Sequence, residues 1–447
     1  MTGKLKAGVA TRDISPKQGL QLAGYPHYER KNIGIHDPLY ASCMYLDNSV
    51  EKIAFVALDL VKYSKSLVRK ARARIEGACG IPGKNVMISC THTHSGPLIS
   101  PIINIDGIKK GEEPDYGYLN EVEDKIVEVV REAVASSFTA KIGVEKGSCG
   151  KEQGVGGNRR DPNGLADPEV WVIGIQDSEC RWRGCAVKYA LHPTLIHGES
   201  KVVSADYPCY LRRYLSEIKP GITTLFLQGT SGNQSSRYFR KGQTFSEAKR
   251  IGETIAAEAN RVMDNMTLAE NAELVVQSVE KTIDIREIPP LDKAERAIES
   301  ARRKLEGLRE NKAPYTDIRT AEVNLLGAEN QYGYALVRSK KQKIAAVEDE
   351  LPVEVQVIGI GDGRIVGVQG ELFVEYGLLM QSRSPFDKTF VVELANGALP
   401  GYLCTREAYR EGGYEAGTSL LTGNSGDEIA AAAAELLAKN ACSQKPR

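Results

Sequence analysis

The sequence has no excess of charge of either sign, and this restricts the partners that the protein can have. Lys and Arg together number 58, and Asp and Glu together also number 58. Without a surplus of positive charge there is no electrostatic basis for nucleic acid or an anionic membrane as the main partner. The balance predicts a small-molecule substrate and no nucleic acid.

The sequence also lacks a long apolar run and any arrangement of paired cysteines. No segment approaches the roughly 18 apolar residues typical of a membrane-spanning helix, and residues 1–7 show no apolar stretch of the kind found in a secretory leader. The nine cysteines are scattered, and none forms a Cys-x-x-Cys pair, which favours reduced thiols. We therefore predict a cytoplasmic protein with no membrane span.

Strand-like apolar runs alternate with amphipathic helical patterns along most of the chain. The runs lie at 52–60, 86–90, 170–176, 186–191, 224–227, 353–360, 364–368 and 390–394, and the helical patterns at 64–76, 119–135, 207–218, 246–263 and 426–439. This alternation predicts an α/β fold in which mixed β-sheets are covered by α-helices. No repeat or flexible linker divides the chain, so we expect one domain over 1–447.

A charged segment at 290–345 differs from its surroundings. Ala294, Ile298 and Leu305 recur there at three- and four-residue steps, and Pro314 separates this stretch from a second helical pattern. The segment is predicted to be a helical hairpin inserted within the single domain. A solvated structural arm is the favoured interpretation, and a lid over an active site or a homo-oligomer contact are the alternatives.

Histidine is scarce, and four of the six histidines form two clusters. His92 and His94 follow the run 86–90, where strand alternation would place them on one face. His192 follows the run 186–191, so we expect the two clusters on adjacent strand ends, with Glu371 from a third apolar run beside them. Neutral imidazole is a common metal ligand, and three or four such ligands suit a zinc site. From spacing alone, structural histidines remain an equal alternative.

A set of segments spread over nearly the whole chain resembles the catalytic domain of the neutral ceramidase family. The most specific of them is Thr91-His92-Thr93-His94-Ser95-Gly96-Pro97. The others lie, in the family's order, at 8–16, 34–39, 158–160, 192–194, 204–208, 229–235, 370–371 and 402–415. The resemblance implies a neutral-ceramidase-like catalytic domain that hydrolyses an amide.

The resemblance also implies a set of site residues. A single Zn²⁺ would be held by His92, His192, Glu371 and the phenolate of Tyr402. The residues implied to act on the substrate are His94, Arg159, Ser235 and Tyr414. A protonated His94, Tyr414 or Arg159 could stabilise the oxyanion that amide cleavage creates. Ser235 could be a nucleophile or could orient the attacking water, and the sequence leaves both roles open.

The sequence departs from the family pattern in ways that bear on the substrate. The chain closes soon after 426–439, so we expect no C-terminal immunoglobulin-like domain. Arg237 puts a positive charge where the family's serine motif has a neutral residue, and the segment 290–345 offers no long apolar groove. We predict a zinc-dependent amidohydrolase that cleaves a C–N bond in a small polar cytosolic substrate rather than ceramide, with anionic acylamides and cyclic amides as the candidates. A zinc-dependent esterase, lactonase or deacetylase, or a non-catalytic binding protein, are the alternatives.

Overall fold

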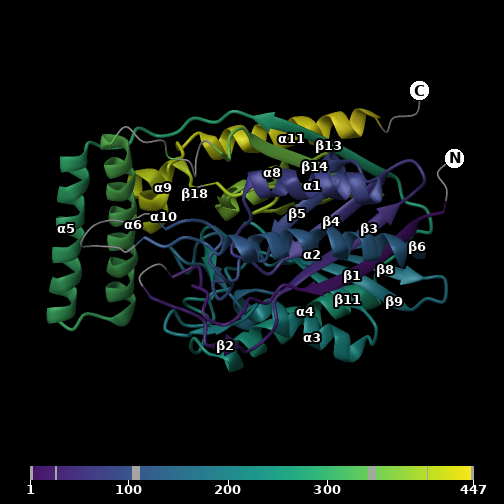
Figure 1. Cartoon of the computed structure of the whole chain (residues 1–447), viewed down its shortest axis with the longest axis horizontal. Helices are drawn as coiled ribbons and strands as arrows, with labels where there is room; N and C mark the ends of the chain where they lie inside the picture. Colours follow the sequence, from purple (N-terminus) through teal and green to yellow (C-terminus); the bar gives the residue numbers. More distant parts are fainter. Residues whose placement is uncertain are drawn as a thin grey trace.

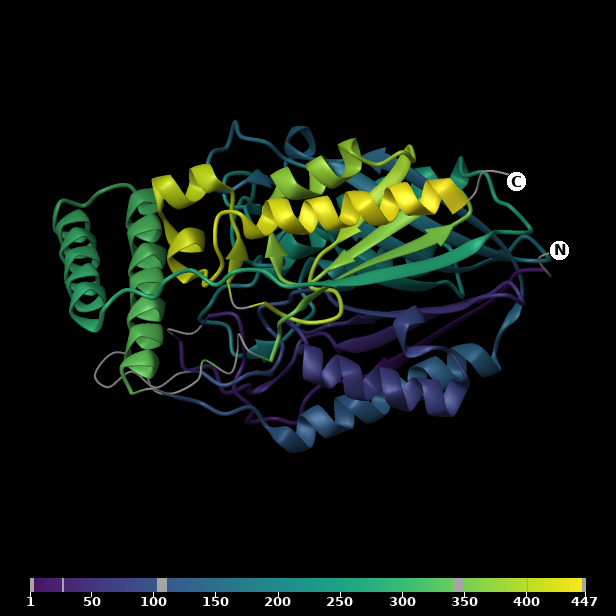
Figure 2. The ribbon, with the colours of Figure 1, turned by 90° about the horizontal axis from the view of Figure 1, so that it is seen from above.

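Two stacked β-sheets form the centre of the molecule, and helices cover both outer faces (Figures 1 and 2). The computed structural model describes residues 4–25, 28–102, 111–340, 344, 349–399 and 401–443. The expected α/β class with mixed sheets covered by helices is confirmed. No helix in these ranges is long and apolar enough to cross a membrane.

The larger sheet has eight strands in the order β11-β9-β8-β6-β1-β3-β4-β5. The strands are β1 (Lys6–Asp13), β3 (Tyr40–Asp47), β4 (Lys52–Leu58), β5 (Val86–Cys90), β6 (Phe138–Ser148), β8 (Glu169–Asp177), β9 (Trp182–Tyr189) and β11 (Thr223–Gln228). Only the edge pairs β4–β5 and β9–β11 are parallel.

The smaller sheet has the order β13-β14-β15-β17. Its strands are β13 (Leu274–Lys281), β14 (Val353–Ile360), β15 (Gly363–Val368) and β17 (Lys388–Val392). Three short pairs lie outside both sheets: β2 (Gly34–Ile35) with β10 (Val202–Val203), β7 (Gly157–Asn158) with β12 (Gln234–Ser235), and β16 (Glu371–Leu372) with β18 (Tyr402–Leu403).

Side-chain alternation buries both faces of the larger sheet. In β3, Cys43 and Tyr45 belong to the core cluster on the outer face, whereas Met44 and Leu46 belong to the cluster between the sheets. Successive side chains of a strand point to opposite faces, so a strand covered on both sides must be apolar throughout. The helix-facing core and the core between the sheets therefore share the same strands.

Helices complete the four layers that Figure 2 shows. On the outer face of the larger sheet, α1 (Lys65–Cys79) and α2 (Tyr116–Ala135) cover one half, and α3 (Tyr207–Ile218) and α4 (Phe245–Asp264) cover the other. On the smaller sheet lie α8 (Val374–Ser382) and α11 (Ser425–Ser443). The other helices of the described ranges are α5 (Leu291–Glu310), α6 (Tyr315–Ser339), α9 (Arg406–Glu411), α10 (Tyr414–Thr418) and the short 3₁₀ turns η1 (Gly83–Asn85) and η2 (Lys151–Gln153).

The helices α5 and α6 form an antiparallel pair at the end of the molecule farthest from both termini (Figure 1). They lie within the segment 290–345, of which residues 341–343 and 345 lie outside the described residues. Gly327 of α6 lies so close to Gly417 of α10 that a Cβ on Gly417 would be 3.3 Å from the Gly327 Cα. Gln331 also donates to the Gly417 carbonyl at 2.7 Å. The pair is therefore anchored through α6.

The strands that precede the two histidine clusters are not neighbours, so our expectation of adjacent strand ends is wrong. Five strands separate β5 from β9 in the hydrogen-bonded order. The sheet curls so that β11 contacts β4 and β5. The segment after β17 links these edges, because Glu393 N donates to Gln228 O at 2.9 Å and Asn396 N donates to Ile88 O at 2.7 Å.

Candidate metal centre and active site

Three electron-rich atoms converge at the floor of the site. His92 Nε2 lies 3.1 Å from His192 Nε2, and Glu371 Oε2 lies 3.3 Å and 3.2 Å from these two nitrogens. Two ligands of a tetrahedral zinc ion at about 2.0–2.1 Å lie roughly 3.3–3.4 Å apart. The triangle therefore has the dimensions of one face of such a site.

The second nitrogen of each ring shows which atoms are free to bind a cation. His92 Nδ1 lies 2.7 Å from the Val61 carbonyl oxygen, and His192 Nδ1 lies 2.7 Å from the Ser231 carbonyl oxygen. A carbonyl accepts only from a protonated nitrogen, so both Nε2 atoms carry lone pairs. Glu371 Oε2 is buried and has no hydrogen-bond donor among the described residues. These residues fit a divalent metal ion.

His94 extends this group. His94 Nε2 lies 3.3 Å from His92 Nε2, and the three imidazoles form a cluster whose ligand atoms all lie within 4.8 Å of one another. Burial, followed by the neighbouring His92 and His192, holds the pKa of His94 well below its usual range. The His94 ring is therefore neutral at neutral pH, although one of the roles expected from the sequence used a protonated ring.

The histidines converge through a turn and not through strand alternation. β5 ends at Cys90, and His92 has a left-handed backbone with φ of 67°. The expectation that strand geometry places His92 and His94 on one face is therefore wrong. A left-handed non-glycine residue costs of the order of 1–3 kcal/mol and persists only where surrounding contacts hold it. Here Arg30 is buried and donates to the His94 carbonyl oxygen from both Nη1 and Nη2 at 3.0 Å.

Glu371 and Tyr402 come together through the short parallel pair β16–β18, in which they are register partners. Tyr402 lies against His192, with 6.5 Å between ring centroids, and against Tyr414, with 5.8 Å. Burial and then the Glu371 carboxylate raise the pKa of Tyr402 well above its usual range. Without a cation beside it, Tyr402 is therefore a neutral phenol.

Arg159 lies over both tyrosines and is held by an acidic partner. Its guanidinium carbon is 5.2 Å from the Tyr402 ring centroid and 5.9 Å from that of Tyr414. Arg159 Nε donates to Glu415 Oε1 at 2.8 Å, while its Nη2 is buried without a hydrogen-bond acceptor in the described ranges. Arg159 also lines the pocket described below, so its guanidinium lies near the position that a ligand would take.

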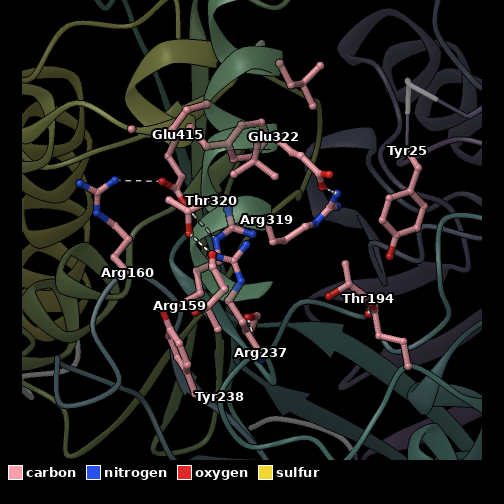
Figure 3. Close-up of a pocket in the computed structure, with 18 of the residues that line it drawn as sticks. Tyr25, Arg159, Arg160, Thr194, Arg237, Tyr238, Arg319, Thr320, Glu322 and Glu415 are labelled. Carbon is pink, nitrogen blue, oxygen red and sulfur yellow. Dashed lines mark hydrogen bonds and ion pairs between the residues drawn. The ribbon is translucent and has the colours of Figure 1, made fainter. Parts of the chain in front are cut away.

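A pocket of about 950 Å³ lies beside the metal triangle, and His92, His192 and Glu371 themselves are not among its lining residues. His94, Arg159, Ser235, Tyr402 and Tyr414 line its inner part. The outer wall comes from α6 and from the segment after β12 (Figure 3). The hairpin is therefore more than a solvated arm, since one of its two helices contributes to the pocket surface.

Ser235 lies on β12 and is buried at the pocket surface. Its hydroxyl oxygen accepts from the Arg237 backbone amide at 3.2 Å. Within the described residues, no hydrogen bond joins Ser235 to a histidine or a carboxylate. A nucleophilic serine normally has such a base within hydrogen-bond reach, so this geometry fits an orienting role better than a nucleophilic one.

Two buried residues that the sequence did not reveal support His192. The Ser231 hydroxyl lies 3.3 Å from His192 Nδ1 and donates to Glu393 Oε1 at 2.6 Å, and Glu393 Oε2 accepts from Leu372 N at 2.7 Å. Glu393 therefore connects two parts of the site: through Ser231 it supports the ring of His192, and through Leu372 it holds the strand that carries Glu371. In the sequence, Glu393 could have been recognised as a candidate only from its position directly after the apolar strand β17.

Comparison with known proteins identifies a relative in sequence. No protein-family model matches the chain. The neutral ceramidase of Pseudomonas aeruginosa is 23% identical over 249 residues, which are 51% of this chain and 36% of that protein. The match thus spans about a third of the length of this relative.

Solved structures show the same fold over the whole chain. The crystal structure of the neutral ceramidase from Pseudomonas aeruginosa matches with a TM-score of 0.73 and 18% identity, covering 100% of this chain and 76% of that one. A ceramidase complexed with C2 matches with a TM-score of 0.72 and 17% identity, covering 98% and 76%. The resemblance found in the sequence is confirmed: the chain has the neutral ceramidase fold, and over about half of its length it is similar in sequence to a neutral ceramidase.

Proposed function

We propose that this protein is a zinc-dependent amidohydrolase that cleaves a C–N amide bond in a small polar substrate rather than in ceramide. The observation that carries the proposal is the triangle of His92 Nε2, His192 Nε2 and Glu371 Oε2, whose sides measure 3.1–3.3 Å. Tyr402 would be the fourth ligand, since it is the register partner of Glu371. A zinc ion held there would supply Lewis acidity next to the pocket, whose lining includes the neighbouring His94 and Tyr402.

The protein's own residues would orient and polarise the amide. Arg159 lines the pocket, and burial followed by Glu371 raises the pKa of Tyr414, so this phenol keeps its proton. Both groups can donate to the carbonyl oxygen as it gains negative charge, and such donors act most strongly where water is excluded. Neutral His94 can accept a proton from the attacking water and pass it to the leaving nitrogen, so the hydroxyl of that water stays on the acid product and its proton on the amine.

The shape and lining of the pocket support a compact polar substrate. Its volume of about 950 Å³ lies within the range of small-molecule sites, and its outer wall carries charged side chains of loop 237–241 and α6. A long alkyl chain would desolvate these charges without replacing their interactions with water. The sequence-based expectation of a cytoplasmic location accords with such a substrate and stays a prediction.

Metal analysis of the purified protein tests the proposal directly. We expect about one zinc per chain, loss of the metal and of hydrolysis in His92→Ala, and return of activity when zinc is restored to chelator-treated wild type. His36→Ala is the matched control, because His36 stacks on Phe245 away from the pocket and should keep its metal.

Matched amide and ester panels then identify the bond. Faster turnover of amides supports the proposal, whereas turnover of esters alone would assign an esterase or deacetylase. A zinc-loaded protein that turns over no member of either panel would instead be a binding protein on the same scaffold.

A further inference from the structure

The outer part of the pocket carries three positive side chains on one short loop. Arg237, Arg240 and Lys241 follow β12 and all line the pocket. Arg240 Nη1 donates to the Thr194 carbonyl oxygen at 3.1 Å. None of the three forms an ion pair with a carboxylate in the parts of the chain that the structure describes. The nearby Glu247 is engaged by Arg250 at 2.6 Å.

Of the four acidic residues that line the pocket, three are engaged by other cations. Glu411 pairs with Arg160 at 3.0 Å, and only Asp161 forms no ion pair within the described residues. Glu415 accepts from Arg159 at 2.8 Å and from Arg160 at 2.9 Å. Glu322 of α6 accepts from Arg319 at 2.9 Å and from Arg309 at 2.9 Å. The loop 237–241 therefore faces the pocket with an excess of positive charge, although the chain as a whole carries none.

Two cations of the loop also lie near further guanidinium groups, Arg237 near Arg159 and Arg319, and Arg240 near Arg319. Burial and then the nearby Arg159 lower the pKa of the Arg237 guanidinium, which shows that its charged form is both poorly solvated and repelled. In Figure 3 the side chains of Arg159 and Arg237 extend into the same region, and Arg319 approaches from α6. An anion placed between them would relieve the repulsion, and guanidinium groups bind carboxylate and phosphate through paired hydrogen bonds.

We propose that Arg237, Arg240 and Lys241, facing Arg319 of α6, form a subsite for an oxyanion group of the substrate. The proposal rests on the proposed function and narrows it: the substrate is a small amide that bears a carboxylate or a phosphate. The scissile amide would lie over His92, His192 and Glu371 while the acidic group lies toward the hairpin. The hairpin then acts as one wall of a specificity pocket.

Binding of simple anions tests the subsite without requiring turnover. Calorimetric titration of zinc-loaded protein with inorganic phosphate and with glutarate should show binding of at least one of them. Affinity should fall about tenfold or more in the double variant Arg237→Gln, Arg240→Gln. The charge-preserving double variant with lysine at both positions should retain most of it. Arg303→Gln is the matched control, because Arg303 lies on the outer helix α5 with its side chain 75% exposed.

A matched substrate pair tests specificity. An N-acyl amino acid and the corresponding N-acyl amino alcohol share the scissile bond and differ only in the charge. We expect a KM about tenfold or more lower for the acid, and a rise in that KM alone when salt increases from about 0.05 to about 0.5 M. The Gln double variant should raise KM for the acid and leave the alcohol unaffected. The comparison of acid with alcohol and the effect of salt are both measured on the wild-type protein, so they test the subsite even if the double variant fails to fold.

The outcomes separate the two proposals. Anion binding that depends on Arg237 and Arg240, without hydrolysis of either substrate, would leave the subsite standing and overturn the amidohydrolase. Equal hydrolysis of acid and alcohol, with no anion binding and no salt effect, would overturn the subsite and leave the amidohydrolase standing. Tighter binding of phosphate or of glutarate identifies the group that the substrate carries.

Discussion

Glu371 and Tyr402 are register partners in a parallel pair only two residues long, β16 with β18. Such a short pair cannot fix its own position, so the residues that flank it must do so. Gly370 has φ of 87° and Gly401 has φ of 89°, and these left-handed turns direct the chain into the pair. Glycine is the residue that adopts this backbone without strain.

Gly401→Ala should displace Tyr402. A Cβ at this position would lie 2.5 Å from the Ser419 Cα and 2.7 Å from the Thr418 carbonyl oxygen. We expect loss of about 1–3 kcal/mol of stability, measured by chemical unfolding, together with weaker zinc binding. Gly221→Ala is the matched control, since Gly221 has φ of 86° with open space around it. If Gly401→Ala and Gly221→Ala had equal effects on stability and zinc binding, backbone strain alone would explain them, and Tyr402 would not be displaced.

Gly24→Ala should move His94 while leaving the metal in place. The Cβ would lie 2.5 Å from both the Cβ and the Cγ of His94, a side chain that also packs edge-on against Tyr25 at 5.3 Å. We expect kcat to fall with little change in zinc content, since His92, His192 and Glu371 are untouched. Gly19→Ala, with φ of 98° and no atom nearby, is the control. Normal kcat in the Gly24 variant would argue against a role for His94.

Glu393→Gln should weaken zinc binding without touching a ligand. Glu393 accepts from Ser231, which contacts the ring of His192, and groups that orient a metal-binding histidine contribute roughly 10-fold to 100-fold in affinity. Competition with a chromophoric chelator would measure the change in Kd. Glu299→Gln, on the exposed face of α5, should leave the Kd unaltered. An unchanged Kd in the Glu393 variant would contradict the link that we describe.

Asp206 should make stability depend on pH. Burial raises the pKa of this carboxyl to about 7, even though its oxygens accept from the backbone amides of Tyr207, Ile196 and Leu195. The folded state therefore binds the proton more tightly than the unfolded state, so stability falls as pH rises from about 4 to about 7, by a few kcal/mol at most, and is then level. Tm measured across this range for wild type and Asp206→Asn should show the difference between them shrink or reverse. A constant difference would refute the shift.

Much of the fold could be predicted because its central strands and helices carry strong local patterns. The strand Val353–Ile360 and the helix Tyr207–Ile218 have the boundaries that their apolar patterns predict. The strands Lys6–Asp13 and Phe138–Ser148 were missed. They mix glycine, lysine and small residues, and they are strands because neighbours on both sides supply their hydrogen bonds.

The candidate site also has a part that the sequence predicted and a part that it could not. The sequence identified the residue types, since Thr91-His92-Thr93-His94 and Gly370-Glu371 stand out at the ends of apolar runs. It could not give the positive φ of His92 or the support of His192 by Ser231 and Glu393, because these depend on segments brought together from distant parts of the chain.

The sequence by itself determined the α/β class, the helical hairpin pattern and the chemistry of the side chains, because local periodicity and residue type are encoded locally. The meeting of His92 with His192, and the placing of α6 over Arg237, were decided only by the tertiary structure. The strands that carry the histidines lie at opposite ends of one sheet. The curl of that sheet brings β11 against β4 and β5, and the packing of α6 on α10 sets the hairpin beside the pocket, so these groups come within reach of one another.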